Sequence, residues 1–433
     1  MFEQRLFEKY LSIINKFNQE ENIIIFLGEN DFCNFVSAFF ACINSNVSLF
    51  LVNPNWGKQE WQQVEKIVTP DLIFGKINYK FSRNKQKKQT RLKGIMIPTG
   101  GTSGQIKFAI HTWETLTNSA LSFYQFFGNL PINSFCCLPL YHVSGLMQVV
   151  RSFISEGDFV FNTFNYLKNN HQSIVNYQDY FISLVPTQLQ FFLDKNPFFL
   201  QQFKTILVGG ASISPQQINL ARTYNLPLAL TYGMTETASG ITILKPEYFT
   251  NNNNSSGQVL PHANIISSEK TKDIDEVRQK GFLQYSTYQQ NIIAIKATSL
   301  FKGYYPHYEE KEIYLTDDVG YFDQEGFLCI LGRNSQKIIT GGENVFPQEI
   351  EKAILNTNLV QDVVIKAEKD PYWGDAIASF YVPKNKGIKP EQIKAKLRGE
   401  ISNYKIPKIW YCVTEIPRNS QGKVEINKLN RRC

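Results

Sequence analysis

The sequence lacks an apolar run long enough to cross a membrane and lacks any cysteine pair of the CxxC type. The best candidate run, residues 32–43, is about half the length of the roughly 20 residues that a transmembrane helix requires. The 7 cysteines are an odd number, which argues against a disulfide framework, and their spacing argues against a zinc ribbon. Charged side chains among the first apolar residues argue against a signal peptide. We therefore expect a cytoplasmic protein without stable membrane insertion.

Aromatic motifs of the kind that stack on bases are also absent from the most basic part of the chain. The net charge is +7, and residues 334–433 carry 17 Lys and Arg against 11 Asp and Glu. A basic segment attracts nucleic acid, but it also suits the phosphates of a small ligand. Since no stacking motif accompanies the charge, we expect no nucleic-acid partner.

What the chain does contain is an alternation of strand-like and helix-like stretches. Residues 22–28 and 47–54 have the composition of strands, and residues 31–45 and 58–68 have helical spacing. This alternation predicts an α/β fold with a parallel sheet that is covered on both faces. Because 433 residues exceed one ordinary core, two or more domains are expected. A change of pattern near residues 332–335 predicts an N-terminal domain of residues 1–333 and a small α+β domain of residues 334–433.

Residues 97–112, IPTGGTSGQIKFAIHT, form a stretch rich in glycine, serine and threonine, with Lys107 near its centre. Backbone N–H groups of such a loop can converge on an anion. The stretch is not a Walker A loop, because Gly104 is followed by Gln105 rather than by lysine and a hydroxyl residue. A surface turn rich in small polar residues remains an equal interpretation of this stretch alone.

Residues 231–238, TYGMTETA, place an aromatic ring, a glycine, a hydroxyl and a carboxylate close together after a strand. Tyr232 could stack on a flat base, and Thr235 could bind a phosphate oxygen. Glu236 could ligate a hard cation such as Mg²⁺. The alternative interpretation is a strand end followed by a capped helix.

Three more stretches have both a functional and a structural interpretation. The acidic side chains in residues 314–333 could bind ribose hydroxyls, but they could equally cap the turn of a hairpin. The glycines in residues 337–351 allow a backbone to approach a ligand, although a tight turn needs nothing more. In residues 416–429, a glycine-containing turn presents Lys423, which could instead be an ordinary solvated lysine.

Together, the order and spacing of these stretches resemble the adenylate-forming superfamily of acyl-CoA synthetases, luciferases and peptide-synthetase adenylation domains. The resemblance runs from about residue 20 to the end of the chain. It implies a large N-terminal domain of layered β-sheets flanked by helices, and a small mobile α+β C-terminal domain. It also implies that ATP, with Mg²⁺, adenylates a carboxylic acid and that coenzyme A then takes the acyl group.

The resemblance assigns roles residue by residue. It makes Lys423 the catalytic lysine, adds Glu236, Thr235, Lys107 and His142 to the catalytic set, and makes Glu236 the metal ligand. The nucleotide site comprises Thr99, Gly100, Gly101, Thr102, Ser103, Gly104, Gly209, Gly210, Ala211, Tyr232, Gly233, Asp318 and Arg333. The resemblance also assigns the hinge and the coenzyme A site to Ser335, Gly341 and Gly342.

The chain departs from the superfamily pattern at three positions. Ile106 stands where proline usually precedes the loop lysine, and Asp317 replaces the glycine of a Thr-Gly-Asp motif. Ser335 occupies a hinge position that is often aspartate.

The acid substrate is indicated by residues 138–153, LPLYHVSGLMQVVRSF. His142 and Ser144 precede an apolar helix that Arg151 interrupts. A structural histidine and a snorkelling surface arginine are the alternatives. The stretch resembles the succinylbenzoate–CoA ligase subgroup of menaquinone and phylloquinone biosynthesis. That resemblance implies 2-succinylbenzoate as substrate, with Arg151 as partner of its ring carboxylate and His142 and Ser144 nearby.

Two other enzyme functions stay open. The chain could be a CoA ligase for another aryl or medium-chain carboxylic acid, or a stand-alone adenylation module that loads a carrier protein. A nucleotide-binding protein without activity is least favoured, because Lys423 and Glu236 are both present. A homodimer is compatible with the resemblance, but nothing in the sequence sets the oligomeric state.

Overall fold

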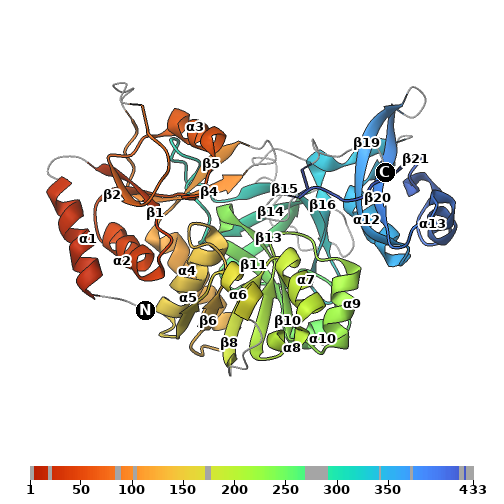
Figure 1. Ribbon diagram of the computed structural model, residues 1–433, viewed down its shortest axis with the longest axis horizontal. Helices are drawn as coiled ribbons and strands as arrows, with labels where there is room; N and C mark the ends of the chain where they lie inside the picture. The colour runs from red at the N-terminus through yellow and green to blue at the C-terminus, as the bar shows by residue number, and fades with distance from the viewer. Residues whose placement is uncertain are drawn as a thin grey trace.

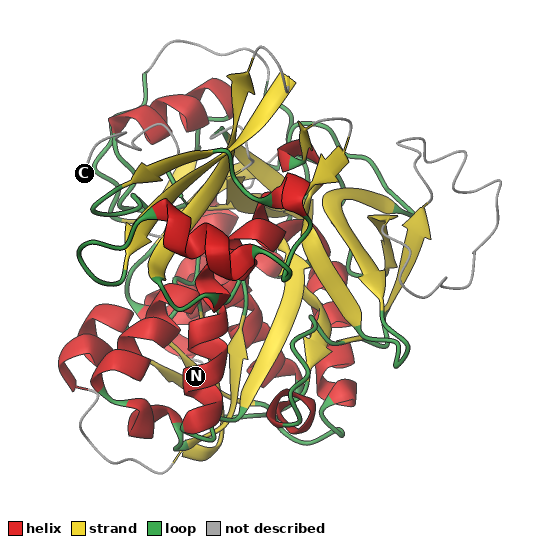
Figure 2. Ribbon diagram, turned by 90° about the vertical axis from the view of Figure 1, so that its right-hand side faces the viewer, coloured by secondary structure: helices red, strands yellow, loops and turns green. Residues whose placement is uncertain are grey.

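The computed structural model describes residues 4–17, 22–82, 89–100, 105–170, 177–268, 291–340, 343–370, 374–418 and 424–425. These residues form four β-sheets and the helices around them, as Figure 1 shows along the chain. Figure 2 shows the same elements by type, with the helices grouped around the strands. Within the described residues, no helix has both the length and the apolar character needed to span a bilayer.

The first sheet has the strand order β3-β1-β2-β4-β5. Its strands are β1 (Ile23–Gly28), β2 (Val47–Leu51), β3 (Leu72–Gly75), β4 (Gly94–Gly100) and β5 (Ile106–His111). The first four strands pair in parallel, and β4 and β5 form an antiparallel hairpin. The predicted strands at residues 22–28 and 47–54 are thus confirmed.

Helices cover both faces of this sheet. They are α1 (Gln4–Phe17), α2 (Phe32–Ile43) and α3 (Lys58–Ile67). Ile25 of β1 packs in a core shared with α1 and α2, whereas its neighbour Phe26 packs with Trp61 of α3 on the other face. Alternate residues of a strand point to opposite faces, so a run that is apolar throughout needs cover on both sides.

The second sheet has seven strands in the order β12-β11-β10-β9-β8-β6-β7. Its central strands are parallel, and β11 and β12 add antiparallel pairs at one edge. The strands are β6 (Asn133–Cys136), β7 (Phe159–Phe161), β8 (Tyr177–Leu184), β9 (Phe203–Val208), β10 (Leu228–Met234), β11 (Ser239–Leu244) and β12 (Gln258–Val259). The accompanying helices are α4 (Trp113–Phe126), α5 (Val143–Ile154), α6 (Phe164–Asn170), α7 (Pro186–Lys195), α8 (Pro197–Leu200), α9 (Pro215–Thr223) and α10 (Pro246–Thr250).

The third sheet is antiparallel and comprises β13 (Ala263–Ser268), β14 (Asn291–Ala297), β15 (Tyr314–Phe322) and β16 (Leu328–Arg333). The hairpin predicted within residues 314–333 is present between β15 and β16, where the Asp323 carboxylate accepts two backbone N–H groups. The structural interpretation of this stretch is therefore correct, and Asp318 still lies on β15 beside Arg333.

The fourth sheet lies at the opposite end of the molecule from the first (Figure 1). A short turn, η2 (Asn334–Gln336), leads from β16 into it, at the predicted domain boundary. The strands are β17 (Ile338–Thr340), β18 (Glu343–Val345), β19 (Val360–Asp370), β20 (Gly374–Pro383) and β21 (Ile409–Cys412), with α12 (Pro347–Asn356) and α13 (Pro390–Leu397) beside them. The division of the chain into two domains at this turn stays a prediction.

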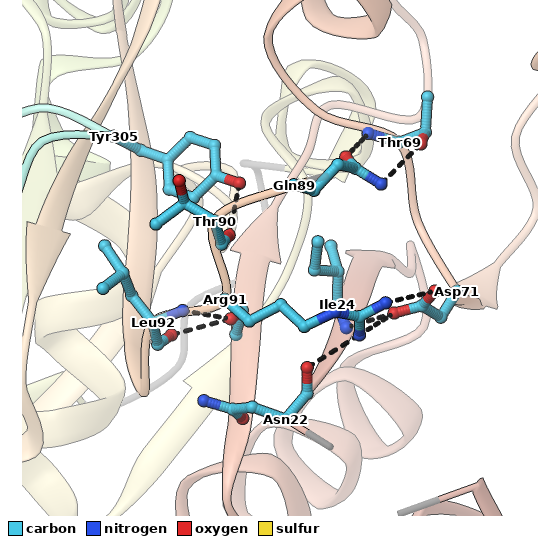
Figure 3. A network of polar contacts seen from close by, with 10 residues as sticks. Asn22, Ile24, Thr69, Asp71, Gln89, Thr90, Arg91, Leu92 and Tyr305 are labelled. Atoms are coloured by element: carbon cyan, nitrogen blue, oxygen red, sulfur yellow. Dashed lines mark hydrogen bonds and ion pairs between the residues drawn. The ribbon is translucent and has the colours of Figure 1, made fainter. Parts of the chain in front are cut away.

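A polar network fixes the segment that leads into β4 (Figure 3). Arg91 donates to the Asp71 carboxylate at 2.6 Å and to the backbone carbonyl of Asn22 at 2.7 Å. Tyr305 donates to the carbonyl of Thr90 at 2.6 Å. Because these contacts come from distant parts of the chain, they position the β4–β5 hairpin relative to the rest of the N-terminal part.

Candidate active site

The turn between β10 and β11 carries Thr235 and Glu236 in a short 3₁₀ segment, η1 (Thr235–Thr237). Gly233 lies against the next strand so closely that a Cβ atom would fall 2.1 Å from the carbonyl oxygen of Ser239. Ala238 follows with a φ of +51°, in the left-handed region. The glycine of the sequence motif is therefore required by the backbone path, and the expected capped helix is only a single turn.

The four backbone carbonyls of residues 235–238 all accept hydrogen bonds from elsewhere in the chain. The donors are the Nε2–H of His111 at 2.8 Å, the backbone N–H of Phe301 at 2.9 Å, and the hydroxyls of Ser299 at 2.9 Å and Ser119 at 2.8 Å. Burial lowers the pKa of His111 to about 4, so the ring is neutral near pH 7. This rigid support was not foreseen from the sequence.

Glu236 is the buried carboxylate of this turn, with 7% of its surface exposed. Its Oε1 accepts a hydrogen bond of 2.6 Å from the Tyr304 hydroxyl. The ammonium group of Lys107 lies 5.1 Å from the centre of the Tyr304 ring. The structure thus brings Lys107 and Glu236 together through Tyr304, a residue that the sequence analysis missed.

The surroundings of Glu236 fit a magnesium ion that is shared with phosphates. Mg²⁺ in proteins is usually held by one or two carboxylates, and substrate phosphates and waters complete its shell. The described residues contain no cluster of three or more His, Cys, Asp or Glu side chains that could enclose a metal. Magnesium binding at Glu236 stays a prediction.

Tyr232 connects the second and third sheets. Its hydroxyl donates to Oδ2 of Asp318 at 2.7 Å, and the Nε of Arg333 lies 3.7 Å from Oδ1 of the same carboxylate. Burial raises the pKa of Asp318, while the hydrogen bond from Tyr232 and the charge of Arg333 lower it in part. The three predicted nucleotide-site residues are thus in contact, although the Tyr232–Asp318 link was not predicted.

Gly209, Gly210 and Ala211 follow the carboxyl end of β9, which is the strand beside β10 in the second sheet. A Cβ atom on Gly209 would fall 2.3 Å from the Thr231 hydroxyl oxygen, and Gly210 has a φ of +79°. Gly209 thus lets the backbone approach β10 closely, and Gly210 supplies the left-handed turn that follows.

The predicted phosphate loop joins β4 to β5. Thr99 pairs with Lys107 and Gly100 pairs with Ile106 across the hairpin, so the lysine lies beside the start of the loop. The other loop residues, and three predicted residues of the C-terminal part, lie outside the described residues: Gly101, Thr102, Ser103, Gly104, Gly341, Gly342 and Lys423.

Two of the departures from the superfamily pattern contact each other. The carboxylate of Asp317 accepts the backbone N–H of Ser335 at 3.0 Å, and it also accepts the Ser335 hydroxyl. A carboxylate from β15 therefore lies at the predicted hinge position and accepts hydrogen bonds from the turn that leads into the C-terminal part.

Arg151 is buried in the last turn of α5, with 6% of its surface exposed, so the alternative of a snorkelling surface residue is wrong. Its guanidinium lies 4.1 Å from the centre of the Phe123 ring, and Nη2 donates to the Ser239 hydroxyl at 3.0 Å. Its Nε is buried without a partner, and no ion pair joins it to a carboxylate of the described residues. Burial lowers the pKa of Arg151 to about 10.

The other two predicted substrate residues lie at the start of the same helix. His142 is the N-cap residue of α5 and is half-buried, and Ser144 is exposed. Nine residues of helix separate His142 from Arg151, which corresponds to about 13 Å along the axis. Gly145 has a structural role, because a Cβ atom there would fall 2.2 Å from the carbonyl oxygen of Pro139.

Comparison with known proteins gives two family matches. Residues 94–305 match the AMP-binding enzyme family, and residues 349–423 match the AMP-binding enzyme C-terminal domain. The chain is 32% identical over 348 residues to the 2-succinylbenzoate–CoA ligase of a Geobacillus species, which covers 77% of this chain and 68% of that protein. It is 28% identical over 434 residues to the 2-succinylbenzoate–CoA ligase of Listeria innocua, which covers 96% and 90% of the two chains.

A solved structure shares the fold. The O-succinylbenzoate coenzyme A synthetase of Bacillus subtilis, in complex with AMP, superimposes with a TM-score of 0.82 and 21% identity. The match covers 100% of this chain and 95% of that chain. The predicted architecture of layered sheets, helices and a small α+β C-terminal part is confirmed.

Proposed function

The chain belongs to the AMP-binding enzyme family, and on that premise we propose that it is an AMP-forming ligase that joins 2-succinylbenzoate to coenzyme A. The acid first reacts with ATP to give an acyl-adenylate and pyrophosphate. Coenzyme A then displaces AMP and takes the acyl group. The support from relatives is that two proteins carrying this name are similar to the chain over most of its length.

The observation that carries the choice of acid is the buried guanidinium of Arg151. A buried charge without a counter-ion is strongly unfavourable, so this site favours binding of an anion. 2-Succinylbenzoate has two carboxylates, of which one reacts with ATP and the other stays on the ring. We assign the ring carboxylate to Arg151, where charge-assisted hydrogen bonds stabilise it.

The adenylation step needs stabilisation of the negative charge that builds on the phosphates as the carboxylate attacks the α-phosphorus. Lys423 is the proposed catalytic cation, and Lys107 and the loop from Thr99 add donors for the phosphates. Mg²⁺ bound at Glu236 supplies neutralisation of phosphate charge. Tyr304 holds the Glu236 carboxylate in one orientation through its 2.6 Å hydrogen bond.

Recognition of the nucleoside rests on the residues around Asp318. We assign the ribose hydroxyls to its carboxylate, which Tyr232 and Arg333 hold. We assign the adenine ring to the backbone at Gly209 and Gly210. The Tyr232 hydroxyl bonds to Asp318, and we assign stacking on the adenine to the Tyr232 ring.

The thioester step is proposed to follow a rotation of residues 334–433 about the turn at Ser335, a hinge motion of a common kind. The rotation would exchange Lys423 for the segment at Gly341 and Gly342 beside the thiol. The excess of +6 charges in this part suits the phosphates of coenzyme A. A cytoplasmic location and a homodimer remain expectations.

A panel of acids tests the proposal. The purified protein is incubated with ATP, Mg²⁺, coenzyme A and one acid, and both AMP and the CoA thioester are measured. We expect 2-succinylbenzoate to give the highest kcat/KM. Preference for an aryl acid such as coumarate, or for a medium-chain fatty acid, would favour another CoA ligase. Adenylate formation without CoA thioester would favour a module that loads a carrier protein.

A further inference from the structure

His262, just before β13, is a partly buried polar residue that has no role in the proposed mechanism. Its backbone N–H donates to the Ser122 hydroxyl at 3.1 Å, and its Nε2 lies 2.9 Å from the Ser299 hydroxyl oxygen. Its Nδ1 is buried without a partner among the described residues.

The contacts of Ser299 determine which nitrogen of His262 carries the proton. The Ser299 hydroxyl has one hydrogen, which it donates to the carbonyl of Thr237 at 2.9 Å. Its oxygen must therefore accept from His262, so Nε2 bears the hydrogen and Nδ1 bears a lone pair. Burial and the positive charge of Arg151 lower the pKa of His262 to about 4, which keeps the ring neutral near pH 7.

Two elements hold His262 and Arg151 in the same region. On α4, Ser122 bonds to His262, and its neighbour Phe123 lies under the guanidinium of Arg151. Thr237 lies in the turn after β10, and Ser299, which follows β14, links His262 to its carbonyl. Two residues later, Ser239 at the start of β11 accepts a hydrogen bond from Arg151. The Nε–H of Arg151 is an unpaired buried donor and Nδ1 of His262 is an unpaired buried acceptor. The charge of Arg151 acts on the His262 ring, which agrees with their shared neighbours.

We propose that His262 is a positioning residue for acid recognition, whose Nδ1 accepts a hydrogen bond through one water molecule from the Arg151 guanidinium. A neutral acceptor orients the guanidinium without cancelling its charge, as a carboxylate would do. The full charge then stays available for the ring carboxylate of the substrate. This inference rests on the proposed function, because it requires Arg151 to bind that carboxylate.

Two substitutions separate the two nitrogens of the ring. In His262→Gln the amide nitrogen can still donate to Ser299, but no acceptor remains at the position of Nδ1. In His262→Asn the amide oxygen can take the position of Nδ1, while the link to Ser299 is lost. The readout is the ratio of kcat/KM for 2-succinylbenzoate to kcat/KM for 4-oxo-4-phenylbutyrate, which lacks the ring carboxylate.

We expect His262→Gln to lower this ratio by about 10-fold, the effect of one hydrogen bond to a charged group. We expect His262→Asn to lower it by less than about 3-fold, and the rate with 4-oxo-4-phenylbutyrate to change little in either variant. A purely structural role would reduce the use of both acids equally and leave the ratio unchanged. An unchanged ratio in His262→Gln would overturn the inference.

Ser299→Ala provides a second test if His262→Gln does not fold. Without the Ser299 oxygen, no acceptor keeps the proton of the His262 ring on Nε2. If the proton moves to Nδ1, that nitrogen becomes a donor and can no longer accept a hydrogen bond from the Arg151 side. The ratio should again fall several-fold, and an unchanged ratio would count against the inference. If the wild-type protein itself does not distinguish the two acids, the assignment of the ring carboxylate to Arg151 fails first, which separates that failure from this one.

Discussion

Replacing Arg151 with methionine should make the unliganded protein more stable and the enzyme poorer. Methionine has a similar length, packs well against the Phe123 ring and carries no charge. In the wild-type protein the guanidinium is buried at 6% exposure and has no counter-ion among the described residues. The substitution therefore removes an unfavourable charge from the unliganded protein, and it removes the group to which we assign the second carboxylate.

The magnitude follows from the environment of Arg151. Burial lowers its pKa from 12.5 to about 10, which corresponds to roughly 3 kcal/mol at about 1.4 kcal/mol for each tenfold change in proton affinity. The lost hydrogen bond to Ser239 and the lost contact with Phe123 offset about 2 kcal/mol of this. A net gain of about 1 kcal/mol in the free energy of unfolding is expected. The kcat/KM for 2-succinylbenzoate should fall by roughly 10- to 100-fold.

Arg222 offers a matched control. It lies on α9 with its guanidinium 4.5 Å from the Phe249 ring, but its donors are satisfied by the carbonyls of Phe249 and Asn253 and by the Asn254 side chain. Arg222→Met should lower the midpoint of thermal unfolding and leave the acid preference unchanged. If Arg151→Met melts below the wild type by a similar amount, the charge of Arg151 is balanced within the fold and the reasoning is refuted.

Three further predictions concern other parts of the site and the fold. Lys423→Ala should slow adenylation by roughly 10²- to 10³-fold but spare thioester formation from supplied acyl-adenylate, and equal losses in the two half-reactions would argue against the rotation. Tyr304→Phe should raise the Mg²⁺ concentration for half-maximal rate several-fold, because the Glu236 carboxylate loses its 2.6 Å donor; an unchanged value would exclude this role. Burial raises the pKa of Glu351 from 4.5 to about 7, so the wild type should lose stability as the pH rises from about 4.5 to about 7. Glu351→Gln should remove that part of the pH dependence of thermal unfolding, and a curve that keeps it would contradict the assignment.

Local pattern was sufficient to predict several of the N-terminal strands and helices. The apolar run at residues 22–28 and the amphipathic stretch at 58–68 have the period of their elements, and both form as expected in β1 and α3. The same reasoning predicted the β15–β16 hairpin, because its turn residues lie next to one another in sequence. The helix α1 was not predicted.

The contacts of the site were harder to predict, because they join residues far apart in the chain. Tyr304 lies 68 residues from Glu236, and Tyr232 lies 86 residues from Asp318. His111 and His262 have no local motif. Only the folded chain shows that His111 supports the turn at Thr235 and that His262 bonds to Ser299. The only signal in the sequence would have been the presence of tyrosines and histidines near the strands that carry the predicted site. That signal is weak.

The most direct test of the proposed activity compares two acids in one assay with the wild-type protein. 2-Succinylbenzoate and 4-oxo-4-phenylbutyrate are each supplied with ATP, Mg²⁺ and coenzyme A, and the initial rate of CoA-thioester formation is measured by mass spectrometry together with AMP release. We predict that 2-succinylbenzoate gives the thioester and AMP in equal amounts, with a kcat/KM at least about 10-fold above that of the analogue. Equal use of the two acids, or no thioester from 2-succinylbenzoate, would contradict the proposed substrate.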